Sequence, residues 1–367
     1  MVDKKRITFF LDALHGGGAE RAVVNILKGL VQRDEFDLDL VLATKEGPYL
    51  DSVPSEVRIV DLQAGRAISA TFPLVSYLRR NRPWAVVGSM GHVNVVASMA
   101  TKLSGVKTKL LLVEHNTISA NQIKLKRSKL VFQLMKWLYP TADGVGGVSV
   151  GVSRDLEQCL GLKPESVRVL HNPVVNEDLI AQSQADLDHP WFAADTPPVF
   201  LAVGRLSPQK DFPNLLKAFA LVREHKSARL MILGEGEDRS ALESMIKDLG
   251  ITNDVLLPGF VSNPYAYMRH ASCFVLSSRQ EGLPTVLIEA MACGCPVVST
   301  DCPSGPDEIL AGGTYGILAP VKDSAALGRG MLATLENPTA SETLKKRANQ
   351  YSTAKTVGTY VSLLEEL

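Results

Sequence analysis

The sequence predicts an α/β protein made of two doubly wound parallel sheets, and two observations lead to this prediction. Short apolar and β-branched runs alternate with longer amphipathic stretches in both halves of the chain, which is the pattern of βαβ units. The length of 367 residues also exceeds the size at which a single hydrophobic core usually stops growing. We therefore expect two Rossmann-like domains in series.

The expected elements follow in order along the chain. In the first half, a helix is predicted at 20–31, and strands are predicted at 6–11, 36–43, 85–88 and 109–113. In the second half, similar apolar runs predict strands at 199–204, 228–234, 255–257, 273–276 and 296–299. Neither half contains a low-complexity tract or an internal repeat that would indicate a solenoid or an array.

The boundary between the domains is predicted at Asn172-Pro173, where a short strand ends in a turn. The residue before a proline is biased away from the helical region, so a helix is not expected to continue across this pair. A polar stretch with little periodicity follows from 176 to 198. The sequence thus predicts an N-terminal domain over 1–172, a C-terminal domain over 173–350 and a final segment over 351–367.

Composition and charge exclude several classes of protein. Lysine plus arginine and aspartate plus glutamate both number 39, which argues against a whole-surface nucleic-acid binder. The apolar run at 7–11 is shorter than a signal-peptide core, and no run approaches the roughly 20 apolar residues of a membrane span. The five cysteines form no CxxC pair and lie mostly among apolar residues, as expected of reduced thiols in a cytoplasmic protein: Cys159, Cys273, Cys293, Cys295 and Cys302.

Two glutamates in the segment 281–294 give the most informative local pattern. Glu281 stands in a Gly/Pro turn, and Glu289 follows eight residues later in a helix that is otherwise apolar. Burying an unpaired carboxylate is costly, so Glu289 is expected to have a dedicated partner, which a bound ligand could supply.

Three consecutive glycines, Gly16-Gly17-Gly18, lie between the first strand and the first helix. Glycines there allow backbone N–H groups to approach an anion at the helix N-terminus, although a simple tight turn has the same composition. A nicotinamide-binding fingerprint is disfavoured, because Arg21 stands where its third glycine should be and the second strand ends without the expected acid.

Cations and glycines also follow the first two strands of the second half. Arg205 and Lys210 flank a turn, and an arginine fork with a compact ammonium suits a diphosphate. The free N–H groups of the helix that starts at Pro284 favour an anion as well. Gly234-Glu235-Gly236 ends the next strand, where a nucleoside could lie against backbone.

His115 stands at the carboxyl end of the strand 109–113, where it could touch a substrate hydroxyl or phosphate or have a structural role. Ligands of open α/β sheets bind beyond the carboxyl ends of the strands, and all of these motifs stand at such strand ends. We expect the two domains to face one another across a cleft that holds the substrate.

Together these motifs resemble the retaining glycosyltransferases of the GT-B fold, family 4, over nearly the whole chain. The resemblance is carried by the glycine loop with Ala19-Glu20-Arg21, the 204–210 turn, the 234–236 turn, the spacing from Glu281 to Glu289, and the segment Ser304-Gly305-Pro306-Asp307-Glu308-Ile309. It implies that the second domain binds a nucleotide sugar, that the first glycine loop reaches the donor phosphates, and that the last helix, near 357–366, crosses back onto the first domain.

The resemblance also implies roles for individual residues. Arg205 and Lys210 would bind the diphosphate, Glu289 the ribose hydroxyls and Glu281 the donor sugar, while His115 would contact the transferred sugar. The implied catalytic residues are Arg205, Lys210, Glu281 and His115. The implied donor-binding residues are Gly16, Gly17, Gly18, Glu20, Gly204, Gly234, Glu235, Gly236, Phe260, Val261, Gly282, Leu283, Pro284, Thr285 and Glu289.

The resemblance implies a reaction without a metal or other cofactor, in which the departing diphosphate oxygen takes the acceptor proton and electrostatic stabilisation lowers the barrier. Ser304-Gly305-Pro306 stands where many relatives carry a Gly-Gly turn, which resembles a branch that uses UDP-linked galactose or N-acetylhexosamine. Two Asp-x-Asp pairs, Asp37-Leu38-Asp39 and Asp186-Leu187-Asp188, match the metal motif of the other major glycosyltransferase fold, and we predict that both are solvated faces.

The segment 123–138 mixes five cations with Leu, Phe, Met and Trp, a composition typical of a helix on an anionic membrane surface or of an ordinary basic amphipathic helix. We hypothesise a lipid-linked acceptor such as a polyprenyl-diphosphate sugar, and a cytoplasmic protein that contacts the membrane peripherally. Two alternatives stay open: a transferase with a soluble acceptor, and a nucleotide-sugar 2-epimerase of the same fold. Epimerases lack this glycine loop and need further acid/base carboxylates.

Overall fold

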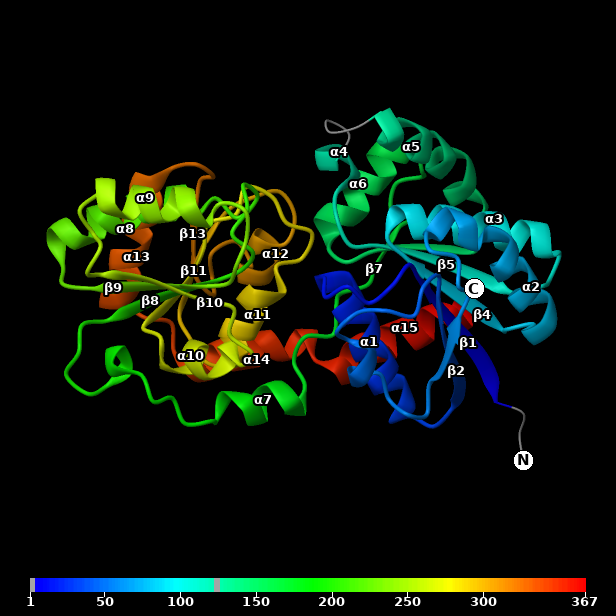
Figure 1. Cartoon of the computed structure of the whole chain (residues 1–367), viewed down its shortest axis with the longest axis horizontal. Coiled ribbons are helices and arrows are strands. Elements are labelled where there is room, and N and C mark those ends of the chain that lie inside the picture. The colour runs from blue at the N-terminus through cyan, green and yellow to red at the C-terminus, as the bar shows by residue number, and fades with distance from the viewer. Residues whose placement is uncertain (1–3, 122–125) are drawn as a thin grey trace. The chain divides into compact units, whose positions relative to one another are not determined.

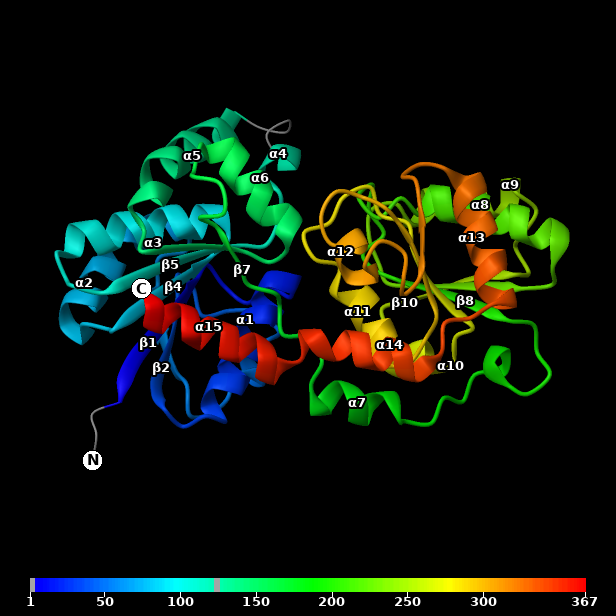
Figure 2. The same cartoon turned by 180° about the vertical axis from the view of Figure 1, so that it is seen from behind.

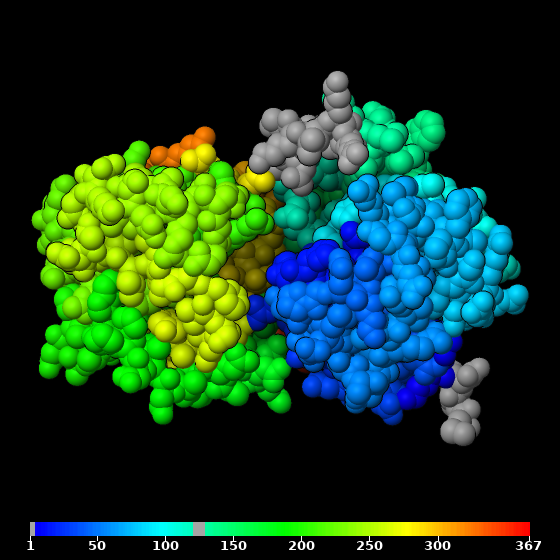
Figure 3. Space-filling view, in the orientation of Figure 1, coloured from blue at the N-terminus to red at the C-terminus, as the bar shows by residue number. Residues whose placement is uncertain are grey.

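The computed structural model describes residues 4–121 and 126–367, which are coloured in Figure 3. The chain divides into two compact units. The first contains Met1–Pro173 and Thr353–Leu367, and the second contains Val174–Ser352. The segment at the C-terminal end of the chain therefore belongs to the unit that contains the N-terminus.

A seven-stranded sheet forms the centre of the first unit, in the order β3-β2-β1-β4-β5-β6-β7. All of its pairings are parallel, and β1 pairs with both β2 and β4. The chain thus winds outward from β1 in both directions, as in a doubly wound sheet. Its strands are β1 (Lys5–Leu11), β2 (Phe36–Leu42), β3 (Arg58–Asp61), β4 (Ala85–Ser89), β5 (Lys109–Glu114), β6 (Gly144–Gly147) and β7 (Arg168–Val169).

Helices cover this sheet on both faces (Figure 1): α1 (Gly18–Val31), α2 (Thr71–Asn81), α3 (Gly91–Ser104), α4 (Ile118–Asn121), α5 (Lys126–Leu138), α6 (Val150–Leu160) and the C-terminal α15 (Thr353–Glu366). The helices α1 and α15 lie side by side in both ribbon views (Figures 1 and 2). They approach closely because Gly29 has no side chain: a Cβ there would lie 2.6 Å from Cγ2 of Thr353.

The second unit repeats the architecture with six parallel strands in the order β10-β9-β8-β11-β12-β13. The aromatic side chains of Phe200 and Phe219 meet edge to face in its core, with ring centroids 6.3 Å apart. Its strands are β8 (Val199–Val203), β9 (Arg229–Leu233), β10 (Val255–Gly259), β11 (Cys273–Leu276), β12 (Val297–Thr300) and β13 (Ile317–Ala319). Its helices are α7 (Glu177–Ser183), α8 (Phe212–His225), α9 (Arg239–Asp248), α10 (Pro264–His270), α11 (Thr285–Ala292), α12 (Pro306–Leu310), α13 (Ser324–Glu336) and α14 (Ser341–Ala348).

The two doubly wound parallel sheets confirm the predicted fold class. Three strands, β3, β6 and β13, were not predicted. The sequence of β6 is Gly-Val-Gly-Gly, which is not typical of a strand. Glycine is needed at 146 because a Cβ there would lie only 2.5 Å from Cδ1 of Leu170. The stretch 176–198, whose sequence has little periodicity, contains the helix α7, and Asn176 caps this helix by accepting a hydrogen bond from the N–H of Leu179 at 2.8 Å.

The prediction that both Asp-x-Asp pairs are solvated was wrong for Asp39. This carboxylate is 2% exposed, accepts a hydrogen bond from Nε of Arg58 at 2.9 Å, and accepts another from the hydroxyl of Tyr77. Burial, together with the hydrogen bond to Asp39, raises the pKa of Tyr77 well above its usual value. Asp37 is half-buried and pairs with Arg6 at 3.1 Å, whereas both aspartates of the second pair, at 186 and 188, are exposed.

We expect Asp39→Ala to lower the free energy of unfolding by about 2 kcal/mol, because it leaves the buried Tyr77 hydroxyl and the Arg58 guanidinium without their acceptor. Urea denaturation would measure the change. The control is Asp37→Ala in the same strand, whose half-exposed pair should contribute no more than about 0.5 kcal/mol. Equal losses from the two variants would contradict the structural role of Asp39.

Within the described part of the chain, no helix is long and apolar enough to cross a membrane. All five cysteines are free, and four of them are buried while Cys159 is half-buried. Burial raises the pKa of Cys293 and of Cys302 to about 12, so these thiols stay protonated at neutral pH.

Candidate active site

Loops at the carboxyl ends of β8 and β9 approach one another so closely that only glycine fits. A Cβ at Gly234 would lie 2.0 Å from the carbonyl oxygen of Gly204, and one at Gly236 would lie 2.2 Å from that of Leu206. The backbones are joined by hydrogen bonds, including one of 2.9 Å from the N–H of Leu206 to the carbonyl oxygen of Glu235. The structure thus brings Gly204, Gly234 and Gly236 together.

Lys210 forms an ion pair with Glu281 from the loop after β11. Its Nζ lies 2.7 Å from Oε1 of Glu281, and the two side chains are only 18% and 10% exposed. The hydroxyl of Ser278 donates a second hydrogen bond to the same oxygen at 2.6 Å, and that of Ser277 donates to the carbonyl oxygen of Lys210 at 2.7 Å. The ammonium group is therefore held in place before any ligand binds.

A second pair behind Lys210 was missed by the sequence analysis. Asp211 is 2% exposed, and its Oδ1 lies 2.7 Å from Nη2 of Arg279. The hydrogen bond to Asp211 raises the pKa of Arg279, and the N–H of Arg279 donates to the carbonyl oxygen of Gln209 at 2.8 Å. These contacts fasten the loop after β11 to the loop after β8. The partners are 68 residues apart in sequence, so no local pattern indicated them.

Other predicted donor residues lie on the outer part of these loops. The side chain of Arg205 is 77% exposed, and its Nε lies 3.5 Å from Oε2 of Glu237. Glu235 pairs instead with Arg239 at 2.7 Å. After β10, Phe260 is 80% exposed and Val261 is half-buried. The long guanidinium of Arg205 and the ring of Phe260 are thus accessible to a ligand.

The predicted residues from 282 to 285 form the turn that starts α11. Gly282, Leu283 and Pro284 are buried, and Thr285 is half-buried. The turn rests on Gly305, which has a φ of +98° and where a Cβ would lie 2.4 Å from Cδ of Pro284.

Glu289 is 4% exposed in α11 and takes part in an interaction within the protein. Glu289 therefore has a partner within the protein and does not require a ligand for this purpose. Its assignment to the ribose stays a prediction.

In the first unit, the glycine loop begins α1. Gly16 has a φ of +102°, Gly17 is the N-cap, and nothing lies within 4 Å of the position a Cβ would take at Gly18. Glu20 is buried, and a Cβ at Gly17 would lie 2.3 Å from its Oε2, which has no hydrogen-bond partner among the described residues. The glycine loop thus has open space at Gly18 and a buried carboxylate, that of Glu20, beside Gly17.

His115 directly follows β5 and is 7% exposed. Neither ring nitrogen has a hydrogen-bond partner within 4–121 and 126–367. Burial lowers the pKa of His115 to about 4, so the imidazole is neutral at pH 7. A buried imidazole with two unpaired nitrogens is costly, and a polar ligand would relieve that cost.

The neighbouring Glu114, to which no role was predicted, joins three elements. Its Oε1 accepts a hydrogen bond of 2.8 Å from Nδ2 of Asn94 in α3 and one from the hydroxyl of Tyr139 after α5. Burial raises its pKa to about 7, opposed by these bonds and by one from the backbone of Gly91. The carboxyl thus fixes the strand end that carries His115.

These shifts predict a pH dependence of stability. Because the pKa of Glu114 is raised from 4.5 to about 7, its contribution is fully present below 4.5 and is lost as the pH rises through 7. We expect the free energy of unfolding of Glu114→Gln, relative to wild type, to rise over this pH window and to level off above it. Urea denaturation at a series of pH values would measure it.

His115→Asn is the matched control with the opposite sign. The pKa of His115 is lowered from 6.5 to about 4, so wild type gains stability as the pH rises between these values and the variant does not. A difference between Glu114→Gln and wild type that does not change with pH would contradict the assignment.

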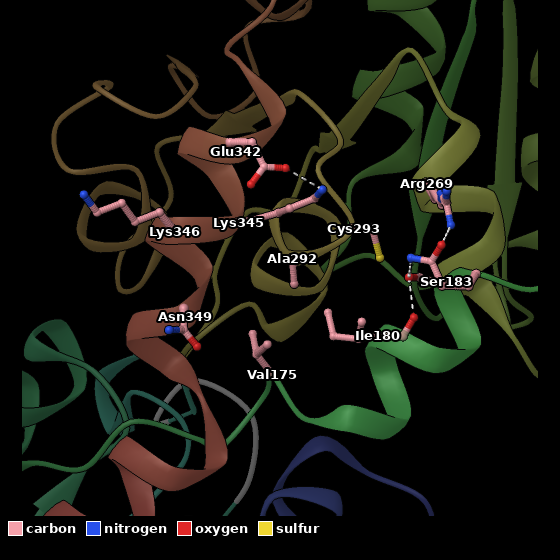
Figure 4. A pocket seen from close by; sticks show the side chains of 11 residues that line it. Val175, Ile180, Ser183, Arg269, Ala292, Cys293, Glu342, Lys345, Lys346 and Asn349 are labelled. Carbon is pink, nitrogen blue, oxygen red and sulfur yellow. Dashed lines mark hydrogen bonds and ion pairs between the residues drawn. The ribbon is translucent and has the colours of Figure 1, made fainter.

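The second unit also contains a cavity of about 480 Å³, which is separate from the candidate active site (Figure 4). It lies between α7, α10, α11 and α14, at the carboxyl end of α11, and none of the predicted site residues lines it. The predicted donor residues of the second unit lie instead on the loops after β8 to β11 and on α11 as far as Glu289, and the others lie at the start of α1 in the first unit.

Comparisons with known proteins identify the family of the chain. The family model described as Glycosyltransferase Family 4 matches residues 16–178, and the one described as Glycosyl transferases group 1 matches residues 184–354. A Campylobacter jejuni protein named N-acetylgalactosamine-N,N'-diacetylbacillosaminyl-diphospho-undecaprenol 4-alpha-N-acetylgalactosaminyltransferase is 30% identical over 356 residues, 94% of each chain.

Two further proteins are similar over most of their length. The amylovoran biosynthesis glycosyltransferase AmsD of Erwinia amylovora is 28% identical, over 84% of this chain and 85% of its own. The solved structure of Anabaena Alr3699/HepE in complex with UDP superposes with a TM-score of 0.78 at 20% identity, over 99% of this chain and 100% of that one. The last likeness concerns the fold.

Proposed function

Since this chain belongs to the glycosyl transferases group 1 family and has the GT-B fold, we propose that it transfers a hexose or N-acetylhexosamine from a nucleotide sugar to an acceptor with retention of configuration. The observation that carries the proposal is the nearly buried pair of Lys210 and Glu281. It stands at the carboxyl end of the second sheet and joins the loop after β8 to the loop that leads into α11. A fixed ammonium at this position suits the leaving diphosphate of a nucleotide sugar.

The donor is proposed to be UDP-linked. The glycines at 204, 234 and 236 are half-buried and carry no side chain, which suits a nucleoside that lies against backbone, and the exposed Arg205 can reach a phosphate. The UDP in the structure of the Anabaena protein supports this choice of base. The turn at Gly305, which supports Pro284, is the feature that resembles the branch using UDP-galactose or UDP-N-acetylhexosamine.

In the proposed reaction, the bond between the anomeric carbon and the diphosphate oxygen breaks, and the acceptor hydroxyl attacks from the same face. The departing oxygen takes the proton of that hydroxyl, so no protein base is required. Lys210, Arg205 and the N–H groups at the start of α11 stabilise the charge on the diphosphate. We propose that neither a metal nor another cofactor takes part.

Glu281 and His115 are proposed to position the transferred sugar. Glu281 holds Lys210 through one oxygen, Oε1, so its other oxygen can accept a hydrogen bond from a sugar hydroxyl. The neutral imidazole of His115 has one donor and one acceptor nitrogen for the same sugar. The glycine loop at 16–18 is proposed to contact the donor phosphates.

A thermal-shift panel of UDP, GDP and ADP with their common sugars, each with and without EDTA, tests this function. We expect UDP and its sugars to raise the melting temperature whether or not EDTA is present. Stabilisation by GDP or ADP and their sugars instead would change the assignment of the nucleotide base. No shift with any nucleotide would contradict the proposed donor site.

The acceptor is proposed to be a lipid-linked saccharide in glycan or polysaccharide assembly, at the cytoplasmic face of a membrane. The names of the Campylobacter and Erwinia relatives support this class of acceptor. On α5, Leu130 and Trp137 are 66% and 78% exposed, and their spacing of seven residues puts them on one face beside the exposed Lys129 and Lys136. The part of the predicted membrane segment at 123–125 lies outside the described residues.

We expect the protein to sediment with vesicles that contain phosphatidylglycerol at low salt, and Leu130→Ser with Trp137→Ser to weaken this binding by about tenfold. Loss of two exposed apolar side chains should leave the melting temperature unchanged. Leu103→Ser, another exposed leucine of the first unit, is the control. Binding that is absent, or equal in the variant, would favour a soluble acceptor.

A further inference from the structure

A basic bowl of about 700 Å³ lies in the first unit at the amino ends of β1, β4 and β5. It is at the opposite edge of the sheet from His115 and the glycine loop. Two carboxylates, Asp37 and Asp143, line it together with six cations: Lys4, Lys5, Arg6, Arg82, Lys107 and Lys109. The chain as a whole carries equal numbers of cations and carboxylates, so this excess is local.

The two carboxylates of the bowl are already engaged. Asp37 accepts a hydrogen bond from Nη2 of Arg6 at 3.1 Å, and Oδ2 of Asp143 accepts one from the N–H of Leu110 at 2.8 Å. Lys4 pairs with Asp34 outside the lining at 2.6 Å. The lining thus has six cations for two carboxylates, so much of its positive charge is not neutralised within the bowl.

Three cations, Lys5, Arg82 and Lys107, have no carboxylate partner in the part of the chain that the structure describes. Lys109 donates to the carbonyl oxygen of Leu364 at 2.9 Å rather than to an acid. These residues stand at or just before the first residues of three neighbouring strands, β1, β4 and β5. Their convergence is therefore a product of the fold and not of one basic stretch of sequence.

Trp84 lies among these cations and can report on them. The Nζ atoms of Lys5 and Lys109 lie 4.5 Å and 4.7 Å from its ring centroid. A cation–π contact stabilises each ammonium, but two like charges at one ring repel each other. An anion bound near both ammonium groups would reduce that repulsion.

We propose that the bowl binds a polyanion that bears phosphate groups, at a site separate from the donor site. Ammonium groups together with a guanidinium fork are the groups that recognise phosphate oxygens. A concave site with charges of one sign focuses the field on a small ligand, and its volume lies in the range of about 300–1,000 Å³ typical of ligand pockets. The phosphate could belong to a soluble metabolite or to a lipid headgroup.

Fluorescence of Trp84 tests the proposal. The chain has three tryptophans, so Trp137→Phe with Trp191→Phe leaves Trp84 alone. Inorganic pyrophosphate is titrated into this variant without nucleotide, because UDP itself bears a diphosphate that the bowl would bind. We expect a saturable change in emission, and Arg82→Glu with Lys107→Glu should weaken the binding by about tenfold or more.

Lys102→Glu is the matched control, since it changes the charge of an exposed lysine of the first unit outside the bowl. Calorimetry of pyrophosphate binding to the chain with all three tryptophans gives a second measurement that does not depend on the substitutions at 137 and 191. Trp84 stands at the amino ends of the strands of the first sheet, whereas the predicted donor residues follow the carboxyl ends of strands, so its emission reports on the bowl whether or not the donor assignment is right.

Vesicles of phosphatidylglycerol distinguish the two sources of phosphate. If vesicles change the emission of Trp84 and pyrophosphate does not, the ligand is a lipid headgroup. If pyrophosphate acts alone, the ligand is soluble. No response to either probe, or a response that survives Arg82→Glu with Lys107→Glu, would overturn the proposal.

Discussion

Lys210→Ala is expected to lower kcat about 10²- to 10³-fold, the usual loss when one group that stabilises the charge of a leaving oxygen is removed. The ammonium group is fixed by Glu281 at 2.7 Å and is only 18% exposed, so water would replace it poorly. Because the interaction strengthens as the diphosphate departs, kcat should fall more than KM rises. Steady-state kinetics with the nucleotide sugar identified by thermal shift would measure both.

Folding should be little disturbed in this variant, because Ser278 still donates a hydrogen bond to Glu281. Lys217→Ala is the matched control, since it removes an exposed lysine of α8. Its kcat should equal that of wild type. Full activity of Lys210→Ala, with an unchanged melting temperature, would contradict the role of Lys210 on the diphosphate.

Gly234→Ala is expected to lower the free energy of unfolding by about 3 kcal/mol or more, which is the range of severe backbone conflicts. The residue has a φ of +139°, and its Cβ would lie 2.0 Å from the carbonyl oxygen of Gly204. The atom that it meets belongs to the backbone, so a change of rotamer cannot relieve the conflict. Urea denaturation would measure the loss, and the shift in melting temperature caused by UDP should shrink as well.

Gly250→Ala separates the two causes of this loss. Gly250 also has a positive φ, +69°, but nothing lies within 4 Å of the position of its Cβ. It should therefore cost only the conformational penalty of about 1–2 kcal/mol. Equal losses at the two positions would show that the close approach of the loops after β8 and β9 does not matter.

The sequence predicted the strands well where apolar runs are short and bounded by turns. It missed β6, because glycines carry no hydrophobic signal, and their close packing against Leu170, Ser153 and Leu367 is visible only in the fold. It also missed the burial of Asp39, because the alternating pattern of β2 does not show that Tyr77 and Arg58 supply partners from α2 and β3.

For the candidate site, sequence position predicted which residues stand at the strand ends but not how they pair. The contact between Lys210 and Glu281 joins residues 71 apart, and the contact between Asp211 and Arg279 joins residues 68 apart. Such pairs depend on the order of strands β8 and β11 in the sheet, which puts their loops next to each other. The sequence also could not show that the ring nitrogens of His115 lack hydrogen-bond partners, because this depends on all the residues that pack around the ring.

The assignment of α15 to the first unit has a consequence for biosynthesis. This helix, Thr353–Glu366, is made after the second unit, yet it packs on the face of α1 that contains Gly29. Domains generally fold as units during translation, beginning with the N-terminal one. Here the ribosome must synthesise the whole second unit before α15 can complete the first, so this face of α1 stays exposed until α15 has been made. A transcript truncated before codon 353 would therefore damage the unit that was translated first.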